Sequence, residues 1–419
     1  MAKKQHSPRI IPRAEHTLSR RDIPPNVLKV LYHLDSHGYD AYLVGGCVRD
    51  LLLNHHPKDF DVATNAKPEE VYQIFRNCRL IGRRFRLAHI FFGREIVEVA
   101  TFRGHHATES SSEGHAHDSG LILRDNVYGT IEEDAIRRDF TINALYYNIK
   151  DFSLVDFQHG VDDLHNRKLV IMGDAATRYR EDPVRMLRAI RFVGKLDMVM
   201  SPKTAKPIES LAYLLRQIAP ARLFDEIVKL FHTGYAEKVY KTLRQHHLFE
   251  ILFPHTHLLL TGENKEHWET FLETAYKDTD ARIKQDKSVS CAYLFAFLLW
   301  GVAQKNYMLL VEEMPQTVAM HEAGRVTLKD QQSITALPRR FTNDVIEIWH
   351  LQWRFTRRTP KIVWRTLASP RFRAGFDLLL LRSKADPSLK DLVDWWQTIQ
   401  TVDRPGQEAL IESVKKRSK

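Results

Sequence analysis

The 419-residue chain carries 62 Lys and Arg residues against 52 Asp and Glu residues, a formal net charge of +10 that favours a polyanionic partner such as nucleic acid. Its 43% hydrophobic and 27% charged residues are typical of a folded protein with roughly two to four domains. Three widely separated cysteines, Cys47, Cys78 and Cys291, exclude a disulfide framework and a CxxC metal knuckle, which fits the reducing cytoplasm. The N-terminus lacks the apolar core of a signal peptide, and the most apolar stretch, residues 291–303, is shorter than the ~20 residues that span a bilayer. We therefore expect no integral membrane segment.

The first part of the chain alternates helical and extended patterns. A polar, basic segment at residues 1–22 predicts an extended arm, after which Pro25 opens a helical pattern that Gly38 ends. Residues 85–103 predict a β-hairpin that turns at Gly93. Between these segments we expect strand 39–44, helix 47–54, strand 59–64 and helix 67–78, an order typical of a mixed α/β domain.

The rest of the chain is predicted to be largely helical. Residues 105–120 are rich in Ser and His and predict a loop; the four histidines invite a metal site, and His117–Asp118 a comparison with HD-type phosphohydrolases, but no second ligand cluster accompanies them. A helix is expected over residues 129–147 and a hairpin over 146–157. From about Asp174 onward, helical segments follow one another, interrupted near Pro202, Pro220, Gly234, Pro254, Pro338 and Pro370.

The stretch DFDVAT places two carboxylates one residue apart in an otherwise apolar run. On a strand, residues i and i+2 point to the same side, so Asp59 and Asp61 should project together while Phe60 and Val62 pack behind them. Two carboxylates this close repel each other unless a cation lies between them, and Mg²⁺, a hard ion with oxygen ligands, suits that position. Taken alone, the pair is also consistent with an exposed edge strand that serves solubility.

A glycine pair precedes this strand. Gly45 and Gly46 end one predicted strand and open a helix, where backbone N–H groups and the positive end of the helix dipole suit a triphosphate. Arg49 and Asp50 follow on the first turn. Glycines before a helix are a weak signal by themselves, because tight turns need glycine anyway, but the aspartate pair that follows makes the combination specific.

Two further stretches contain candidate site residues. Glu98 lies on the second hairpin strand with valines on the opposite side, which makes it a candidate for a further metal ligand. Asp139 and Asn143 in RRDFTINA would share a helix face at i, i+4. Arg137 and Arg138 beside them could contact phosphate or ribose, the alternative being a surface charge cluster.

The stretch YREDPVRMLRAIRF, residues 179–192, predicts a helix with Pro183 in its first turn. Asp182, Arg185 and Arg188 recur at helical spacing on one face, with apolar residues over the others. Planar guanidinium and carboxylate groups match the donors and acceptors of a nucleobase edge. A ladder of ion pairs within the helix is the alternative.

Taken together, these motifs resemble the class II nucleotidyltransferase superfamily of bacterial poly(A) polymerases and CCA-adding tRNA nucleotidyltransferases. The segments LVGGCVRDLLL, DFDVAT, EVATFR, RRDFTINA and EDPVRMLRAIRF occur in order over residues 43–192. Others are similar to the poly(A) polymerase branch, namely IPRAEHTLSRRDI, FRNCRLIGRRFRLAHIFFG, ATFRGHH, PARLFDEIVKLF, HHLFEILFP and RFRAGFDLLLLRSK. The resemblance covers about residues 11–396, but this branch leads us to expect a longer basic tail after SVKKRSK.

The resemblance implies a fold and a domain order. The fold would be a palm-like α/β nucleotidyltransferase head followed by an extended all-α neck, body and leg region. The expected segments are a basic arm at 1–22, the catalytic head at 23–157, a helical neck for base recognition and RNA binding at 158–225, a helical body and RNA-binding region at 226–400, and a basic tail at 401–419.

The resemblance also implies roles for the matching residues. Asp59, Asp61 and Asp139 would be the catalytic aspartates, the first two as metal ligands, and Glu98 is our own geometric addition to that set. Two Mg²⁺ ions, or Mn²⁺ in their place, would activate the RNA 3′-hydroxyl and steady the pyrophosphate that leaves ATP. The nucleotide-binding residues would be Gly45, Gly46, Arg49, Asp50, Arg138, Asn143, Asp182, Arg185 and Arg188.

An arginine-rich segment in the helical region is a candidate RNA surface. Between Arg339 and Arg373, eight arginines interleave with Trp349, Trp353 and Trp364, a mixture that suits phosphate neutralisation and base stacking. A packed helical bundle with an arginine-rich outer face is an equally open interpretation. The candidate RNA-binding residues are Arg339, Arg340, Arg354, Arg357 and Arg358.

The expected activity is template-independent addition of AMP from ATP to RNA 3′ ends with release of pyrophosphate, which promotes RNA polyadenylation and decay. A CCA-adding tRNA nucleotidyltransferase would share every catalytic residue and is the nearest alternative. A non-catalytic RNA-binding relative would be expected to lack the carboxylates that this chain retains. RNA 3′ ends and ATP are the expected partners, with an RNA chaperone or RNA-degradation machinery as further ones.

Overall fold

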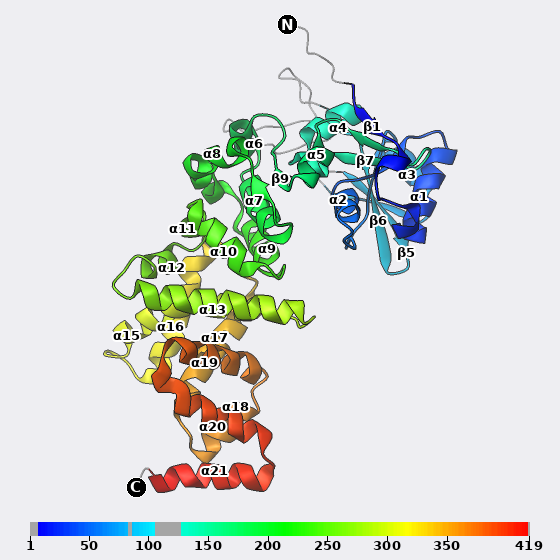
Figure 1. Ribbon diagram of the computed structural model, residues 1–419. Helices are drawn as coiled ribbons and strands as arrows, with labels where there is room; N and C mark the ends of the chain where they lie inside the picture. Colours follow the sequence, from blue (N-terminus) through cyan, green and yellow to red (C-terminus); the bar gives the residue numbers. More distant parts are fainter. Residues whose placement is uncertain (1–6, 83–85, 105–126, 418–419) are drawn as a thin grey trace. The chain divides into compact units, whose positions relative to one another are not determined.

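The computed structural model describes residues 7–82, 86–104 and 127–417, and the chain divides between Leu211 and Ala212 into two compact units (Figure 1). We call them unit 1 and unit 2. The finer domain division given above stays a prediction. The loop expected at 105–120, with its histidines, lies outside the described residues.

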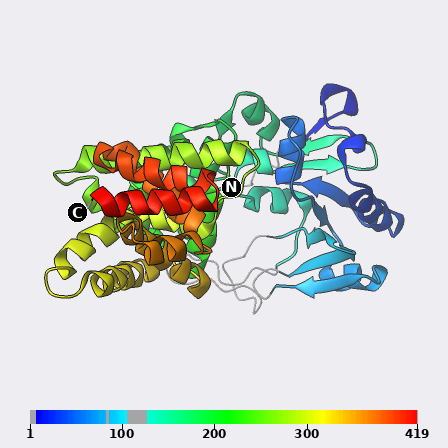
Figure 2. The ribbon, with the colours of Figure 1, turned by 90° about the horizontal axis from the view of Figure 1, so that it is seen from below.

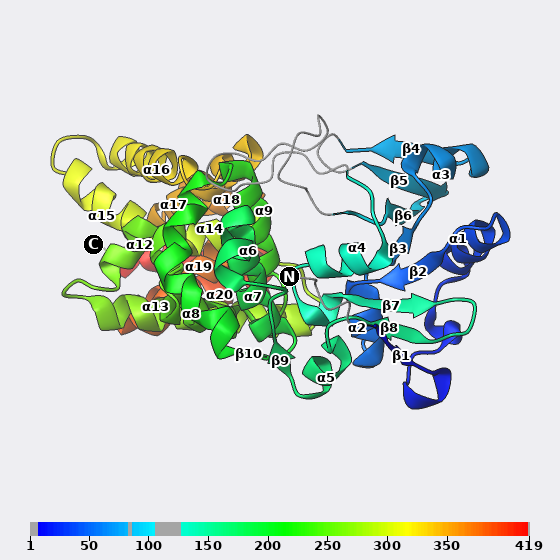
Figure 3. The same ribbon diagram turned by 90° about the horizontal axis from the view of Figure 1, so that it is seen from above.

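Unit 1 is built on a mixed sheet. Within the described residues its strands follow the order β1-β8-β7-β2-β3-β6-β5-β4, with β3 and β6 parallel and every other neighbouring pair antiparallel (Figure 3). The strands are β1 (Arg9–Ile11), β2 (Ala41–Val44), β3 (Asp61–Thr64), β4 (Cys78–Ile81), β5 (Leu87–Phe92), β6 (Glu95–Thr101), β7 (Leu145–Asn148) and β8 (Leu154–Asp156).

Helices pack on this sheet through their apolar sides. Helix α1 buries Val27, Val30 and Leu34 and contacts β2, β3 and β6, while Ala135 of α4 packs with Tyr146 of β7 in a separate cluster. The helices of unit 1 are α1 (Pro25–Ser36), α2 (Gly46–Leu52), α3 (Pro68–Ile74), α4 (Ile131–Arg137), α5 (Gly160–His165), α6 (Ala175–Glu181), α7 (Val184–Lys195) and α8 (Pro202–Leu211). Short elements complete it: η1 (Arg13–Glu15), η2 (Arg20–Asp22), η3 (Thr141–Asn143) and the parallel pair β9 (Lys168–Leu169) and β10 (Val199–Met200).

Most of the expected elements of unit 1 are present, with shifted bounds. The hairpin β5–β6 turns at Gly93, whose φ is +64°, as predicted. The helix expected over 67–78 ends at Ile74, because Cys78 begins β4 and pairs with Ile90. Part of the expected arm is not separate from the sheet, since β1 pairs with β8 at its edge.

The prediction of one helix over residues 129–147 is wrong after Arg137, where α4 ends. Tertiary hydrogen bonds hold the next residues extended: Phe140 bridges to Ile171, and the backbone oxygen of Asp139 accepts from Met172 N at 3.0 Å. The chain then makes the single turn η3 and enters β7. Helical propensity is overridden here by pairing with a segment about thirty residues later, which local patterns do not reveal.

Unit 2 is all-α in the part of the chain that the structure describes, as expected. Its elements are η4 (Ala212–Gln217), α9 (Pro220–Phe231), α10 (Ala236–Gln245), α11 (Phe249–Leu252), α12 (Pro254–Leu259), α13 (Lys265–Lys284), α14 (Cys291–Leu298), α15 (Trp300–Leu310), α16 (Gln316–Gln332), α17 (Arg339–Thr356), α18 (Pro360–Leu367), α19 (Phe372–Ala385), η5 (Pro387–Leu389), α20 (Lys390–Thr401) and α21 (Arg404–Arg417). The apolar stretch 291–303 forms α14 and the start of α15, both largely buried. Of the described helices, none has the length and apolar content needed to cross a membrane.

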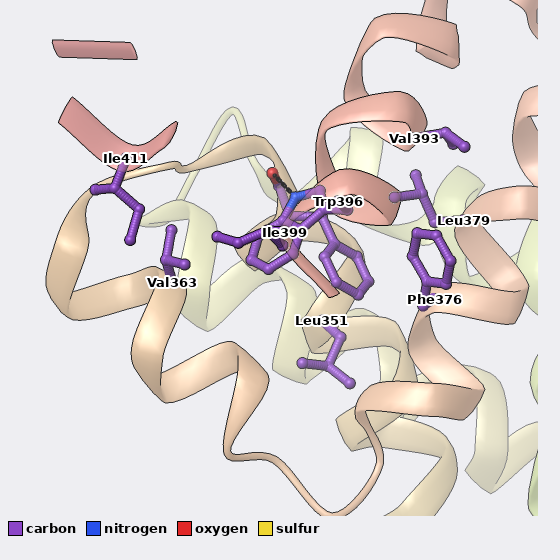
Figure 4. Packing of buried hydrophobic residues seen from close by; sticks show 9 residues of the cluster. Leu351, Val363, Phe376, Leu379, Val393, Trp396, Ile399 and Ile411 are labelled. Atoms are coloured by element: carbon purple, nitrogen blue, oxygen red, sulfur yellow. Dashed lines mark hydrogen bonds between the residues drawn. The ribbon is translucent and has the colours of Figure 1, made fainter. Parts of the chain in front are cut away.

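The C-terminal helices share a hydrophobic core. Trp396 is fully buried against Phe376 and Leu379, and its Nε1 donates to the backbone oxygen of Phe355 at 2.9 Å (Figure 4). The segment expected to be a basic tail contributes to this core, because Ile411 of α21 is only 2% exposed. Helix α21, red in Figure 2, contacts α18 and α20.

Candidate active site

A pocket of about 330 Å³ opens in unit 1 beside the ends of β2, β3 and β6. Strand residues form one side of it and the residues of α4, α6 and α7 form the other. The polar residues that line it are Asp61, Glu98, Arg103, Asp134, Arg137, Arg138, Arg178, Glu181, Asp182 and Arg185. The pocket therefore has a carboxylate end on the strands and an arginine-rich end on the helices.

The carboxylate end comprises Asp59, Asp61 and Glu98. Asp61 begins β3 and lies in register with Val44 on one side and Glu98 on the other. Burial, then the charges of Glu98 and Asp59, raise the pKa of Asp61 to about 6, against the opposing effect of Arg138. The three carboxylates thus form a cluster of negative charge that the protein only partly neutralises.

Asp59 departs from the sequence prediction. It is exposed and precedes β3, because the pairing with β2 stops where Gly45 turns the chain away from Val44. Asp59 therefore lies just outside the strand that was expected to include it, and it does not line the pocket. The two aspartates still interact, since the charge of Asp59 contributes to the raised pKa of Asp61.

Glu98 lies on the pocket side of β6. Val97 and Val99, its neighbours, are 1% and 2% exposed on the other side, as the alternation predicts. The Glu98 side chain is about half exposed, and its Oε1 lies 3.4 Å from His89 Nε2. It is thus available to a ligand in the pocket.

The donor chemistry of the carboxylate end fits a divalent cation. Clustered carboxylates of which one has a raised pKa are stabilised by a metal ion with oxygen ligands. The described residues hold no group of three or more Asp, Glu, His or Cys side chains arranged to bind one metal. A metal held by these carboxylates would complete its coordination with substrate oxygens or water.

Arg138 is a cation whose charge acts on Asp61. Its Nη2 donates to Asp134 Oδ2 at 2.9 Å and its Nε to the Tyr146 hydroxyl at 3.0 Å. Burial opposes its charge, but Tyr146 and Asp134 hold the pKa of Arg138 above its ordinary value. A Cβ at residue 45 would lie 3.2 Å from Arg138 Nη1, so Gly45, with φ at +78°, suits both the turn and this close approach.

Asp139 is fully engaged by protein groups. Its Oδ2 accepts from Arg188 Nε at 2.7 Å, and its Oδ1 accepts from Asn143 Nδ2 and from its neighbour's backbone N–H, both at 2.9 Å. Burial favours the neutral acid, but Arg188 and these hydrogen bonds hold the pKa of Asp139 well below its ordinary value. The expected contact with Asn143 is present without the expected helix.

A residue that the sequence reasoning missed joins the two sides of the arginine-rich end. Arg178 of α6 donates through Nη2 to the backbone oxygens of Arg137 and Arg138, the latter at 2.7 Å, and through Nη1 to Glu181 at 2.7 Å. Arg185 donates to the same Glu181 oxygen at 2.9 Å. Burial and the neighbouring Arg185 lower the pKa of Arg178 to about 10. Arg178 lies four positions before Asp182, a helical spacing that could have indicated its place beside the site.

The predicted nucleotide-binding pair on α2 is buried. Arg49 and Asp50 are 4% and 7% exposed, and Arg49 donates to Asp50 Oδ1 at 2.6 and 2.8 Å and to Asn143 Oδ1 at 2.6 Å. Neither lines the pocket. This geometry favours a supporting role for the pair beneath the site, and direct contact with a triphosphate stays a prediction.

The residues predicted to recognise the base, Asp182, Arg185 and Arg188, are divided between two elements. Asp182 caps the end of α6 and Arg185 lies on α7, and both line the pocket. Arg188 instead turns to Asp139. The three residues do not form the single helical face that was expected, because the chain breaks between α6 and α7 at Pro183.

The candidate RNA-binding arginines lie in and after α17. Within the described part of unit 2, none of the five forms an ion pair. Arg357 lies 4.1 Å over the Trp353 ring, and Arg358 lies 5.6 Å over the Trp395 ring. Trp349, in contrast, is fully buried with Nε1 bonded to Ala296 O, so its place in the RNA-stacking pattern was wrong.

Comparison with known proteins identifies the family. Three family models match: "Poly A polymerase head domain" over residues 41–170, "Probable RNA and SrmB-binding site of polymerase A" over 197–260, and "Polymerase A arginine-rich C-terminus" over 312–419. Poly(A) polymerase I of Escherichia coli O6:H1 is 47% identical over 413 residues, which cover 97% of this chain and 88% of that protein.

The CCA-adding branch is more distant. The CCA-adding enzyme of Lactobacillus helveticus is 37% identical over 209 residues, half of each chain. A crystal structure of the CCA-adding enzyme of Bacillus stearothermophilus in complex with CTP superposes with a TM-score of 0.62 at 23% identity, covering 93% of this chain and 91% of that one, which shows a shared fold. Because the E. coli relative matches nearly from end to end, the chain belongs to the poly(A) polymerase family of the class II nucleotidyltransferases.

Proposed function

We propose that this chain, a poly(A) polymerase by family, adds AMP from ATP to RNA 3′ ends through the pocket that Asp61, Arg138 and Arg185 line. The observation that carries the activity is the 47% identity to Poly(A) polymerase I across 97% of the chain, unit 2 included. The CCA-adding enzymes match only half of the chain in sequence. The pocket supplies the chemistry that nucleotidyl transfer needs, carboxylates at one end and guanidinium groups at the other.

Divalent metal belongs to this proposal, with Mg²⁺ as the specific ion and Mn²⁺ as the alternative. Asp59 and Asp61 would hold it, with Glu98 as a further ligand or as the group that orients them. A metal here would lower the pKa of the attacking 3′-hydroxyl and neutralise charge on the phosphates. The raised pKa of Asp61 supports this assignment, since burial and the neighbouring carboxylates of Glu98 and Asp59 disfavour its charge and a metal ion would favour it.

The protein groups position the substrates. Arg138, fixed by Asp134 and Tyr146, presents its guanidinium next to Asp61, where a triphosphate beside the metal would meet it. Nucleotidyl transfer requires little covalent chemistry from the enzyme, so alignment and charge neutralisation carry the rate. Asp139, expected as a catalytic aspartate, would act by holding Arg188 and Asn143, which its hydrogen bonds to both residues support.

Base selection is assigned to the arginine-rich end. Arg185 and Glu181 are fixed by mutual hydrogen bonds and by Arg178, so their donors and acceptors keep one arrangement. A rigid polar edge of this kind can select adenine without a template strand. Asp182 beside them lines the same pocket.

Unit 2 would bind the RNA body. The exposed Arg339, Arg340 and Arg357 support contact with phosphates, and Trp353 offers a face for stacking. The family model over residues 197–260 names an RNA and SrmB-binding site, which supports an RNA chaperone or RNA-degradation machinery as a further partner. A cytoplasmic location is part of the proposal, because all three cysteines are free thiols.

Primer extension tests this function. Labelled RNA is incubated with Mg²⁺ and each nucleotide separately, on a generic single-stranded oligomer and on a tRNA that lacks its terminal CCA. A long ladder with ATP alone on the generic RNA is expected. Addition of two cytidines and one adenosine to the tRNA, followed by a stop, would assign the chain to the CCA-adding activity instead, and no extension of either RNA would contradict both.

A further inference from the structure

A second cavity in unit 1 lies where the N-terminal residues pack beside β7. We call it the arm cavity; it has a volume of about 170 Å³ and is lined by Arg13, Ser19, Arg20, Arg21, Tyr147 and Phe152. None of these residues lines the catalytic pocket. We propose that the arm cavity binds a backbone phosphate of the RNA, at a point remote from the 3′ end that reacts.

The cavity lining is strongly basic. Three of its six residues are arginines and none is acidic. Among the described residues, no carboxylate lies within ion-pair distance of these guanidinium groups. Arg13 donates to the backbone oxygen of His16 at 2.8 Å and Arg20 to the Tyr32 hydroxyl at 3.1 Å, which leaves most of the five N–H donors of each group for a ligand.

Arg21 is the least constrained of the three. Its backbone N–H bonds Ser19 Oγ within the turn that begins η2, while its side chain has no hydrogen bond to the residues that the structure describes. Arg13, Arg20 and Arg21 are all exposed, so their guanidinium groups are open to a ligand from solvent. The position of Arg21 at a cavity with two other arginines therefore indicates an anionic ligand.

Tyr147 gives independent evidence for a ligand. The residue is fully buried at the base of the cavity, and within the described chain its hydroxyl has no hydrogen-bond partner. Burial raises the pKa of Tyr147 to about 12, so the group is a neutral O–H donor. Leaving a buried donor unsatisfied costs about 1–3 kcal/mol, which a bound oxygen would recover only if small side-chain shifts open the hydroxyl to the cavity.

The size and the lining together favour a phosphate within a nucleotide chain. Guanidinium groups bind phosphate oxygens in bidentate fashion. The volume is below the roughly 300–1,000 Å³ of whole small-molecule sites, so one phosphate with its sugar fits better than a free nucleotide. Phe152, whose ring Arg20 covers at 5.3 Å, adds an apolar wall for the sugar or base.

The position of the cavity separates its ligand from the reacting nucleotide. Successive residues of a strand point to opposite faces of a sheet. Tyr146 bonds Asp134 and Arg138 on the catalytic face, so Tyr147 and the arm cavity lie on the opposite face. An RNA that occupies both sites must extend well beyond its 3′ terminal nucleotides, and this expectation depends on the proposed function for its ligand.

Equilibrium RNA binding without ATP tests the inference. Fluorescence anisotropy of labelled RNA compares the wild type with Arg13→Gln/Arg21→Gln, using RNAs of about 30 and about 6 nucleotides. The matched control, Arg76→Gln/Arg94→Gln, removes the same charge from exposed arginines of unit 1 that do not line the cavity. We expect the long RNA to bind the cavity variant about 3- to 10-fold more weakly, and the short RNA and the control to be unchanged.

The salt dependence gives a second measure. Loss of the one phosphate contact at the cavity should reduce the slope of log K against log salt by about 0.7, the contribution of one phosphate of a single strand. Tyr147→Phe should weaken binding of the long RNA only a few-fold and should raise the Tm of the free protein, because the unsatisfied hydroxyl is gone.

The outcomes separate the two proposals. If the wild type binds neither RNA, the proposed function fails. If the wild type binds both RNAs but the cavity variant matches the control, the arm cavity is not an RNA site. If inorganic phosphate raises the Tm of the wild type and not of the cavity variant while RNA affinity is unchanged, the cavity takes a free anion and the RNA assignment is overturned.

Discussion

At the carboxylate end of the pocket, Asp61 lies in register with Glu98, and burial, then the charges of Glu98 and Asp59, raise its pKa to about 6. Asp139, which follows the pocket residues Arg137 and Arg138 but does not itself line the pocket, has Arg188, Asn143 and a backbone N–H around it, and its pKa lies well below the ordinary value. The same side-chain type is thus held without a full counterion at Asp61 and fully satisfied at Asp139. The carboxylate end is arranged to be completed by a cation, while the arginine-rich end is organised before substrate arrives.

The largest expected effect on activity comes from removing a carboxylate at the carboxylate end of the pocket. Asp61→Asn should reduce AMP incorporation by about 10³-fold or more, because a metal contributes several kcal/mol of transition-state stabilisation. The assay is single-turnover primer extension at saturating ATP. Asp40→Asn, which changes a carboxylate that does not line the pocket, is the control and should retain full activity. Near-normal activity of Asp61→Asn would contradict the metal assignment.

Substitution of Asp139 should lower the stability of the protein as well as its activity. Asp139→Asn leaves Arg188 without its carboxylate and should lower the free energy of unfolding by about 2–4 kcal/mol. Denaturant unfolding measures this change. In Asp139→Asn/Arg188→Met the uncompensated charge is gone, so stability should recover in part while activity stays low. If Asp139→Asn were as stable as the wild type, Asp61 and Asp139 would not differ in the way described.

A substitution of Arg178 tests whether activity depends on a rigid arginine-rich end. Arg178→Lys keeps the charge but presents its donors from a single nitrogen, so it loses the planar fork that reaches two backbone oxygens with one nitrogen and Glu181 with the other. We expect kcat to fall about tenfold with a smaller change in KM for ATP, since alignment is lost more than binding. A change confined to KM would instead indicate direct contact between Arg178 and the nucleotide.

Glu98→Gln should have the smallest effect on activity, and it tests whether Glu98 is a metal ligand or only orients the aspartates. If Glu98 orients the aspartates, Glu98→Gln should lower activity only a few-fold, because the amide keeps the shape and loses the charge beside Asp61. If Glu98 is itself a metal ligand, the loss should approach that of Asp61→Asn. Activity measured over a range of Mg²⁺ concentrations distinguishes the two roles.

Sequence reasoning succeeded where the signal was local. The turn at Gly45, the hairpin at Gly93 and the all-α character of unit 2 follow from residue types and periodicity over a few positions. The pocket side of Glu98 followed from the alternation of one strand.

The features that were missed depend on contacts between distant segments. Arg188 bonds Asp139 across 49 positions, and Arg178 reaches backbone oxygens 40 and 41 positions away. The extended backbone at Phe140 exists because Ile171 pairs with it. Burial was equally hidden: Arg49 and Asp50 look like surface residues by type, and Trp349 lies in an arginine-rich segment, but the packing of other elements makes all three internal.

Thermal denaturation with and without metal tests the contrast between the two ends most directly. The wild type and Asp61→Asn are compared in chelator, then with Mg²⁺ and a non-hydrolysable ATP analogue. We predict that Asp61→Asn is more stable than the wild type in chelator, by on the order of 1 kcal/mol, and that only the wild type gains stability when metal and analogue are added. A variant that is less stable in chelator, or that responds to metal as the wild type does, would contradict a carboxylate end built to be completed by a cation.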